Sequence, residues 1–167
     1  MDYPRKLSIF ALSLFVAITF AASLEVRSRM HSLDEKIWEK LESNQNFQNL
    51  DGIITYNPHT NYPMPPYHSF AESDFQADWG IGGKYFWLTN RRIPVYSNLI
   101  CDSEFSCTAR DYSGNEFEIK EFEEKHFIYI YTDTKIDELD LTLDKINVSA
   151  NYQEFLDFVI THPKIQL

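Results

Sequence analysis

The chain has 167 residues with 25 acidic and 15 basic side chains, and its net charge of −10 excludes a protein whose main task is to grip nucleic-acid phosphates. Hydrophobic residues make up 44% and charged residues 24%, which excludes wholesale disorder and suffices for one packed domain. With 13 Phe and 10 Tyr but only 5 Gly, the chain is not collagen-like or of low complexity. Composition identifies no reaction and no ligand.

The amino-terminal segment is predicted to enter a membrane. From Leu7 to Leu24 the chain carries no charge, and basic residues precede this run. As a helix the run would be about 27 Å long, close to the roughly 30 Å of a hydrocarbon core. Small residues at Thr19, Ala21 and Ser23 also fit a signal-peptide cleavage site. Residues 1–24 are therefore expected to be a transmembrane anchor or a signal peptide.

Residues 25–50 are predicted to form an amphipathic helix or stalk. Apolar residues recur at steps of three and four and make one stripe of Val26, Met30, Leu33, Ile37 and Leu41, widened by Trp38. Ser32 followed by Glu35 has the spacing of a capping box, so a helix that restarts there is an alternative. The stripe is expected to pack on the chain's own domain, with a coiled-coil or partner contact as the alternative.

Residues 51–167 are predicted to be a single α+β domain with an antiparallel sheet of about five to seven strands. The runs with strand character are 53–56, 84–89, 92–96, 99–101, 107–112, 116–120, 126–132 and 139–143. The run at 126–132 is apolar on both faces and is expected to be central. Gly80, Gly82 and Gly83 lack the spacing of a phosphate-binding loop and are interpreted as a turn.

The end of the chain is predicted to be a helix packed on the sheet. Asn151 caps the segment from Tyr152 to Thr161, with Glu154 at the capping-box position, and Pro163 follows its end. Phe155 and its apolar neighbours form the face expected to be buried.

Cys101 and Cys107 are the only cysteines. In an oxidising compartment such a pair can close a small loop across a turn, which would stabilise the fold by about 2–2.5 kcal/mol. The spacing fits neither a redox C-x-x-C motif nor a zinc site. A structural disulfide is therefore predicted, and two separate thiols are the alternative.

A proline-rich loop, residues 57–68, holds the candidate contact residues Tyr62, Met64 and Tyr67. His59 and His68 on the same loop would suit copper together with Met64, but no second cluster of such ligands exists in the sequence. The loop is therefore interpreted either as ordered chain over the sheet or as a surface for a protein partner. The acidic runs near 116–124 and 137–144 are interpreted as solvated surface.

No nucleophile or metalloprotease motif is present, and no catalytic, cofactor-binding or metal-binding residue is predicted. We expect a non-enzymatic protein, held in the membrane by a single pass, whose domain lies outside the cytoplasm and contacts another protein, for example as an accessory subunit of a membrane complex. A soluble secreted or periplasmic inhibitor or immunity-type protein is the alternative, since small size and negative charge suit it. A small extracytoplasmic hydrolase is the third possibility. No nucleic-acid partner is expected.

Overall fold

The computed structural model describes residues 3–59, 74–76, 78–101, 107–111, 114–118, 125–134 and 142–164, without the side chains of 3–7, 76, 78, 98, 101 and 111. Helices, short 3-10 turns (η) and strands follow one another as α1 (Tyr3–Glu42), η1 (Phe47–Asn49), β1 (Gly52–Tyr56), η2 (Asp74–Gln76), α2 (Asp78–Thr89), β2 (Val95–Cys101), β3 (Cys107–Asp111), β4 (Glu116–Glu118), β5 (Phe127–Tyr131), η4 (Leu143–Lys145), β6 (Asn147–Ser149) and α3 (Tyr152–Thr161).

The fold is mixed α+β, as predicted, and its six strands lie in the order β4-β3-β2-β1-β5-β6. The expectation of an antiparallel sheet is wrong for the centre, because β1 runs parallel to both β2 and β5. The outer pairs β2–β3, β3–β4 and β5–β6 are antiparallel. The cause is α2, which lies between β1 and β2 in the chain and carries it back across the sheet, as parallel neighbours require.

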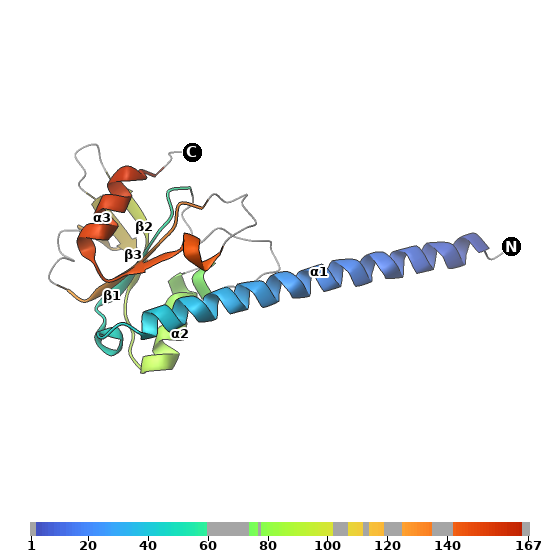
Figure 1. The fold of residues 1–167 in the computed structure, drawn as a ribbon, viewed down its shortest axis with the longest axis horizontal. Coiled ribbons are helices and arrows are strands. Elements are labelled where there is room, and N and C mark those ends of the chain that lie inside the picture. Colours follow the sequence, from blue (N-terminus) through green and yellow to red (C-terminus); the bar gives the residue numbers. More distant parts are fainter. Residues whose placement is uncertain are drawn as a thin grey trace.

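The sheet is the middle layer of three (Figure 1). On one face, Ile53 of β1 and Ile128 of β5 pack in a cluster with side chains of α1 and α2. On the other face, Ile54 of β1 and Tyr129 of β5 pack in a second cluster with Phe155 of α3. Because both faces are covered, every residue of β1 and β5 is buried. The strand predicted near 126–132 is buried on both faces and lies inside the sheet, but it is next to the edge strand β6 and not at the centre.

Helix α1 is continuous from Tyr3 to Glu42, so the predicted alternative of a restart at Ser32 is wrong. Its first half projects away from the domain (Figure 1), and its apolar side chains are exposed. The second half packs on the sheet through the predicted stripe, of which Val26 is partly buried and Met30, Leu33, Ile37, Trp38 and Leu41 are buried. The amphipathic segment is therefore part of the domain core, in agreement with the expected use of its stripe.

The predicted strand 84–89 and the predicted glycine turn before it are both wrong, since these residues form helix α2. Ile81 and Tyr85, four residues apart, are fully buried on one side of this helix. Asn90 ends the helix with φ of 57°, and its amide donates to the Phe86 carbonyl at 2.7 Å. Position 80 of this helix requires glycine, because the Cβ of any other residue would lie only 2.5 Å from the backbone oxygen of Asp74.

The remaining strands differ in their bounds from the predicted ones. The predicted strands 92–96 and 99–101 are one strand, β2, with a register shift between Tyr96 and Asn98. The predicted strand 139–143 falls mainly outside the described residues, and Leu143 begins η4. Helix α3 has the predicted bounds, and the Asn151 side chain accepts hydrogen bonds from the amides of Gln153 and Glu154.

Candidate functional site

The predicted contact residues Tyr62, Met64 and Tyr67 lie outside the described residues, as does His68. Cys101 and Cys107 are opposite partners in the β2–β3 ladder. Partners in an antiparallel pair have Cα atoms about 4.5–5.5 Å apart, within the range of a disulfide. The sulfur–sulfur bond stays a prediction, because the side chain of Cys101 is not among those described.

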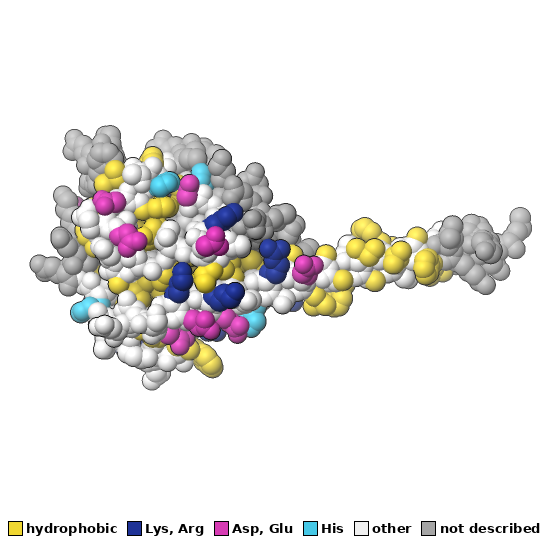
Figure 2. Space-filling view, in the orientation of Figure 1, with side chains coloured by type: hydrophobic (Ala, Val, Ile, Leu, Met, Phe, Trp, Pro, Cys, Tyr) yellow, Lys and Arg dark blue, Asp and Glu magenta, His cyan; other side chains and the backbone are white. Residues whose placement is uncertain are grey.

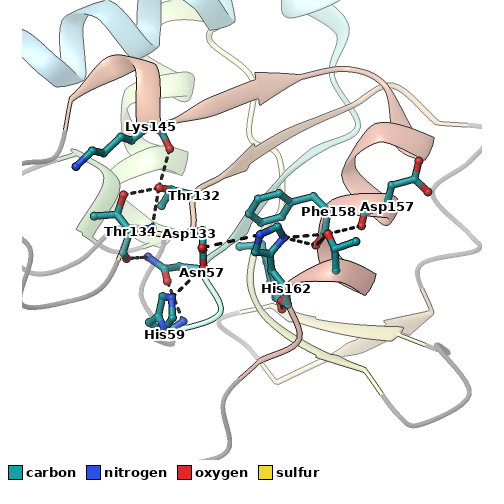
Figure 3. A network of polar contacts seen from close by, with 11 residues as sticks. Asn57, His59, Thr132, Asp133, Thr134, Lys145, Asp157, Phe158 and His162 are labelled. Atoms are coloured by element: carbon teal, nitrogen blue, oxygen red, sulfur yellow. Dashed lines mark hydrogen bonds and ion pairs between the residues drawn. The ribbon is translucent and has the colours of Figure 1, made fainter.

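One polar cluster lies where the parallel strands β1 and β5 end. His59 follows β1, Asp133 follows β5, and His162 is the C-cap of α3 (Figure 3). The Asp133 carboxylate accepts a hydrogen bond from His59 Nε2, at 2.9 Å from Oδ1. His162 Nε2 lies 3.9 Å from Oδ2 of the same carboxylate. Three segments far apart in the chain therefore meet at one acidic side chain.

The His162 ring also contacts the end of α3 through its second nitrogen. Nδ1 lies 3.1 Å from the Phe158 carbonyl and 2.9 Å from the Thr161 hydroxyl. The contact between His162 and Asp133 is an ion pair only in the charged form of the ring.

Hydrogen bonds made by buried side chains next to this cluster hold its segments in place. Thr132 Oγ1 donates to the Lys145 carbonyl at 2.8 Å, and the Asn57 amide donates to the Thr134 carbonyl at 3.2 Å (Figure 3). The Tyr56 hydroxyl donates to the His162 carbonyl at 2.6 Å. Burial, and to a smaller degree the Asp133 carboxylate, raises the pKa of Tyr56 to about 12. The Tyr56 hydroxyl therefore stays protonated and keeps donating at neutral pH.

The chemistry open to this cluster is limited by its geometry. Within the described part of the chain, no three His, Cys, Asp or Glu side chains are placed to hold a metal ion. The Thr161 hydroxyl lies 2.9 Å from His162 Nδ1, but it also lies within 3.0 Å of the carbonyls of Asp157 and Phe158. These contacts attach the His162 ring to α3, and through Asp133 the cluster connects β1, β5 and α3.

The sequence alone indicates His59 only as a possible copper ligand and singles out neither Asp133 nor His162. The position of these residues could have indicated the site, because His59 and Asp133 each follow a strand that is buried on both faces. The carboxyl ends of parallel neighbouring strands meet at one edge of a sheet, where sites in open sheets gather. The expectation of an antiparallel sheet concealed this meeting point.

A second candidate region lies on α2, whose outer side is rich in exposed aromatic residues. Trp79 is 82% exposed and Trp87 is 77% exposed, while Phe86 is partly exposed. Lys84 Nζ lies 5.7 Å from the centre of a Trp87 ring, which is within cation–π range. Aromatic residues are enriched at protein contact surfaces, and among the described residues this side of α2 carries the two most exposed large hydrophobic side chains.

Beside Trp87 lies a groove of about 290 Å³ between α1 and α2, which we call the α1–α2 groove. Its α1 wall is acidic, with Glu35, Glu39 and Glu42 all exposed. Figure 2 shows acidic side chains gathered along the edge of α1 that faces α2. The groove therefore combines negative charge with an exposed indole ring.

The α1–α2 groove is held in shape by hydrogen bonds through η2. The Trp38 indole donates to the Asp74 carboxylate at 3.0 Å, and the Asp74 amide donates to the buried Asp34 carboxylate at 2.8 Å. Lys84 Nζ of α2 pairs with Asp74 at 3.8 Å. These contacts fix α2 against α1, so the groove is preformed.

Comparisons of the chain with protein-family models, with curated proteins and with solved structures found no match in any of the three.

Proposed function

We propose that this chain is a non-enzymatic, membrane-anchored protein whose α+β domain lies outside the cytoplasm and binds other proteins, for example as an accessory subunit of a membrane complex. Helix α1 would cross the membrane with its apolar half. The α2 side of the domain, with Trp79 and Trp87, would supply the contact.

The observation that carries this proposal is the continuity of α1. Among the described helices, α1 is the one long and apolar enough to span a membrane, and its apolar segment is not buried in the domain. Exposed apolar side chains such as Phe10, Phe15 and Phe20 would be unfavourable in water and favourable in lipid. The same helix continues unbroken into the core, which supports an anchor retained in the mature protein.

Placement outside the cytoplasm is supported by the two cysteines. Cys101 and Cys107 are register partners, so a disulfide would need no movement of the backbone. Disulfides persist in oxidising compartments and are rare in the cytoplasm. The proposed bond would join the ends of β2 and β3.

Protein contact is supported by the exposed aromatic side of α2. Two tryptophans each more than three-quarters exposed lie on one helix whose other side is fixed in the core. Their rings can be buried on binding with little loss of side-chain freedom, since tryptophan has only two rotatable bonds.

The test is an intact-mass measurement on protein purified from native membranes, first without and then with reductant. We expect a mass matching residues 1–167 in the detergent-extracted fraction, and a gain of about 2 Da on reduction as two thiols form. Mild cross-linking before extraction should capture a second polypeptide. A full-length protein with no mass gain would place the domain in the cytoplasm.

A soluble protein shortened by about the first 21 or 23 residues would contradict the anchor. It would favour the secreted inhibitor or immunity-type protein, for which the net charge of −10 suits a basic partner. A full-length protein that cross-links to nothing would contradict the proposed contact while leaving the anchor in place.

A further inference from the structure

Helix α1 carries opposite charges on two sides beyond its apolar half. One side has Glu35, Glu39 and Glu42, which we call the acidic row, and another side has Arg29, Lys36 and Lys40, which we call the basic row. All six side chains are exposed. Spacings of three, four and seven keep each row on one side of the helix, and Figure 2 shows the two charges along separate edges of α1.

The surfaces beside the two rows differ in shape. The acidic row borders the α1–α2 groove, from which Trp87 protrudes with 77% of its surface exposed. Arg29 and Lys36 of the basic row line a hollow of about 410 Å³ on another side of α1, which we call the α1–η4 hollow, together with Ser28, Ser32, Leu33, Thr142 and Leu143. One side thus presents carboxylates and a projecting indole ring, and the other presents basic side chains and a hollow.

We propose that the partner of the acidic row is a second copy of this chain, which docks its basic row there in the plane of the membrane. Trp87 of one copy would enter the α1–η4 hollow of the next, where Arg29 and Lys36 can lie against its ring. This inference rests on the proposed membrane anchor, which holds all copies parallel.

The common anchor also matches the heights of the two rows. Lys36 follows Glu35 by one residue and Lys40 follows Glu39 by one residue, so each pair differs by about 1.5 Å along the helix axis. Two copies anchored through the same segment would therefore bring opposite charges to the same level without sliding. Confinement to one membrane raises the effective concentration of the second copy.

A lipid surface fits this region less well than a second copy. The groove beside Trp87 is lined by α1 residues from His31 onward, and His31 lies about 10 Å beyond Leu24 along the axis. The acidic row would also repel anionic headgroups. Because different patches of the two copies meet, the contact can repeat to give a ring or an open row.

The experiment uses charge reversal with full-length protein in neutral phosphatidylcholine vesicles. The acid-reversed variant carries Glu35→Lys and Glu39→Lys, and the base-reversed variant carries Lys36→Glu and Lys40→Glu. Energy transfer between copies labelled with donor and acceptor reports association. Each variant alone should associate on the order of tenfold more weakly than the wild type, and more salt should weaken wild-type association.

Mixing the two variants gives the decisive result. The unaltered basic row of the first meets the unaltered acidic row of the second, and the two reversed rows also match. Association in the equimolar mixture should therefore return to within about threefold of the wild type, a difference of roughly 0.65 kcal/mol. Misfolded variants could not restore it.

Single substitutions test the ring. Trp87→Ala should weaken association severalfold, whereas Ile100→Ala, which removes an exposed apolar side chain of β2 away from the groove, should leave it unchanged. Asp157→Lys on α3 is a matched charge reversal away from both rows and should also have no effect.

The inference is overturned if wild-type copies do not associate in vesicles, if either charge variant alone associates like the wild type, or if the mixture fails to recover. Failure of the anchor would instead appear as a shortened, soluble protein in the mass measurement. If the full-length anchored protein cross-links only to a different polypeptide, the proposed function stands, but the partner is not a second copy of this chain.

Discussion

Three tyrosine hydroxyls lie between the sheet and α3, and their ionisation is opposed by the fold. Burial is the main cause, and it raises the pKa of Tyr56 and of Tyr131 to about 12 and that of Tyr129 in the same direction. The negative charges of Asp133 and Glu154 add to the effect at Tyr56 and Tyr131 respectively. The folded state therefore holds these protons more tightly than the unfolded chain does.

The free energy of unfolding should fall as the pH rises from 10 through 12. A group with a raised pKa contributes stability that is complete below its unfolded pKa of about 10 and is lost as the pH passes the folded value. Urea titrations between pH 8 and 12 would measure the slope. Tyr56→Phe should make the slope shallower, and an unchanged slope would contradict the assignment to this hydroxyl.

Two glycines of α2 should respond oppositely to the same substitution. Gly80→Ala should destabilise the domain by about 1–3 kcal/mol, because the new Cβ would lie 2.5 Å from the Asp74 backbone oxygen. Gly83→Ala meets nothing within 4 Å and should stabilise the helix by about 0.5–1 kcal/mol. Thermal unfolding of both variants measures the contrast. Equal effects would mean that η2 does not press on α2.

Among the elements, α1 should contribute to the stability of the domain as well as tether it. Ile37 is fully buried between α1 and the sheet. Ile37→Ala should therefore lower the free energy of unfolding by about 2–5 kcal/mol, as measured by urea unfolding in mild detergent.

Ser32→Ala is the matched control on the exposed side of α1. Because the helix is continuous at this point, stability should change by no more than about 0.5 kcal/mol. A loss of about 1 kcal/mol would instead indicate that Ser32 caps a separate helix.

The elements that could be predicted are those with clear periodicity and caps. The stripe from Met30 to Leu41 and the Asn151 cap of α3 depend only on neighbouring residues, and both are confirmed. Helix α2 could not be predicted in the same way. Tyr85, Phe86 and Trp87 favour strands, and three glycines disfavour a helix, so tertiary packing overrides local preference there.

The errors in the predicted sheet and in the candidate site follow from the failure to predict α2. Because no helix was predicted between β1 and β2, their parallel pairing could not be inferred, and neither could the contact between His59 and Asp133. A helix places Tyr85 inside and Trp87 outside, whereas a strand would place both on one face. The predicted strand therefore gave no indication that Trp87 would be exposed on the side opposite Tyr85.

For the whole molecule, removal of residues 2–24 should release a folded, soluble domain. Ser8 to Leu24 have no buried side chain, so their loss should leave the melting temperature unchanged while moving the protein from the membrane to the soluble fraction. Removal of residues 2–36 also deletes Met30 and Leu33 from the core and should prevent folding. Circular dichroism and fractionation check both, and loss of fold in the shorter truncation would contradict this division.

The unbroken course of α1 also determines how the domain is oriented. No loop or glycine separates the apolar half from the half that is built into the core, so the domain cannot swivel independently of the apolar half of α1. A change of helix tilt of about 20° would carry the far end of α1 sideways by about 9 Å over its last eighteen residues. In the proposed anchored protein, bilayer thickness would therefore set the angle of the domain through the tilt of α1.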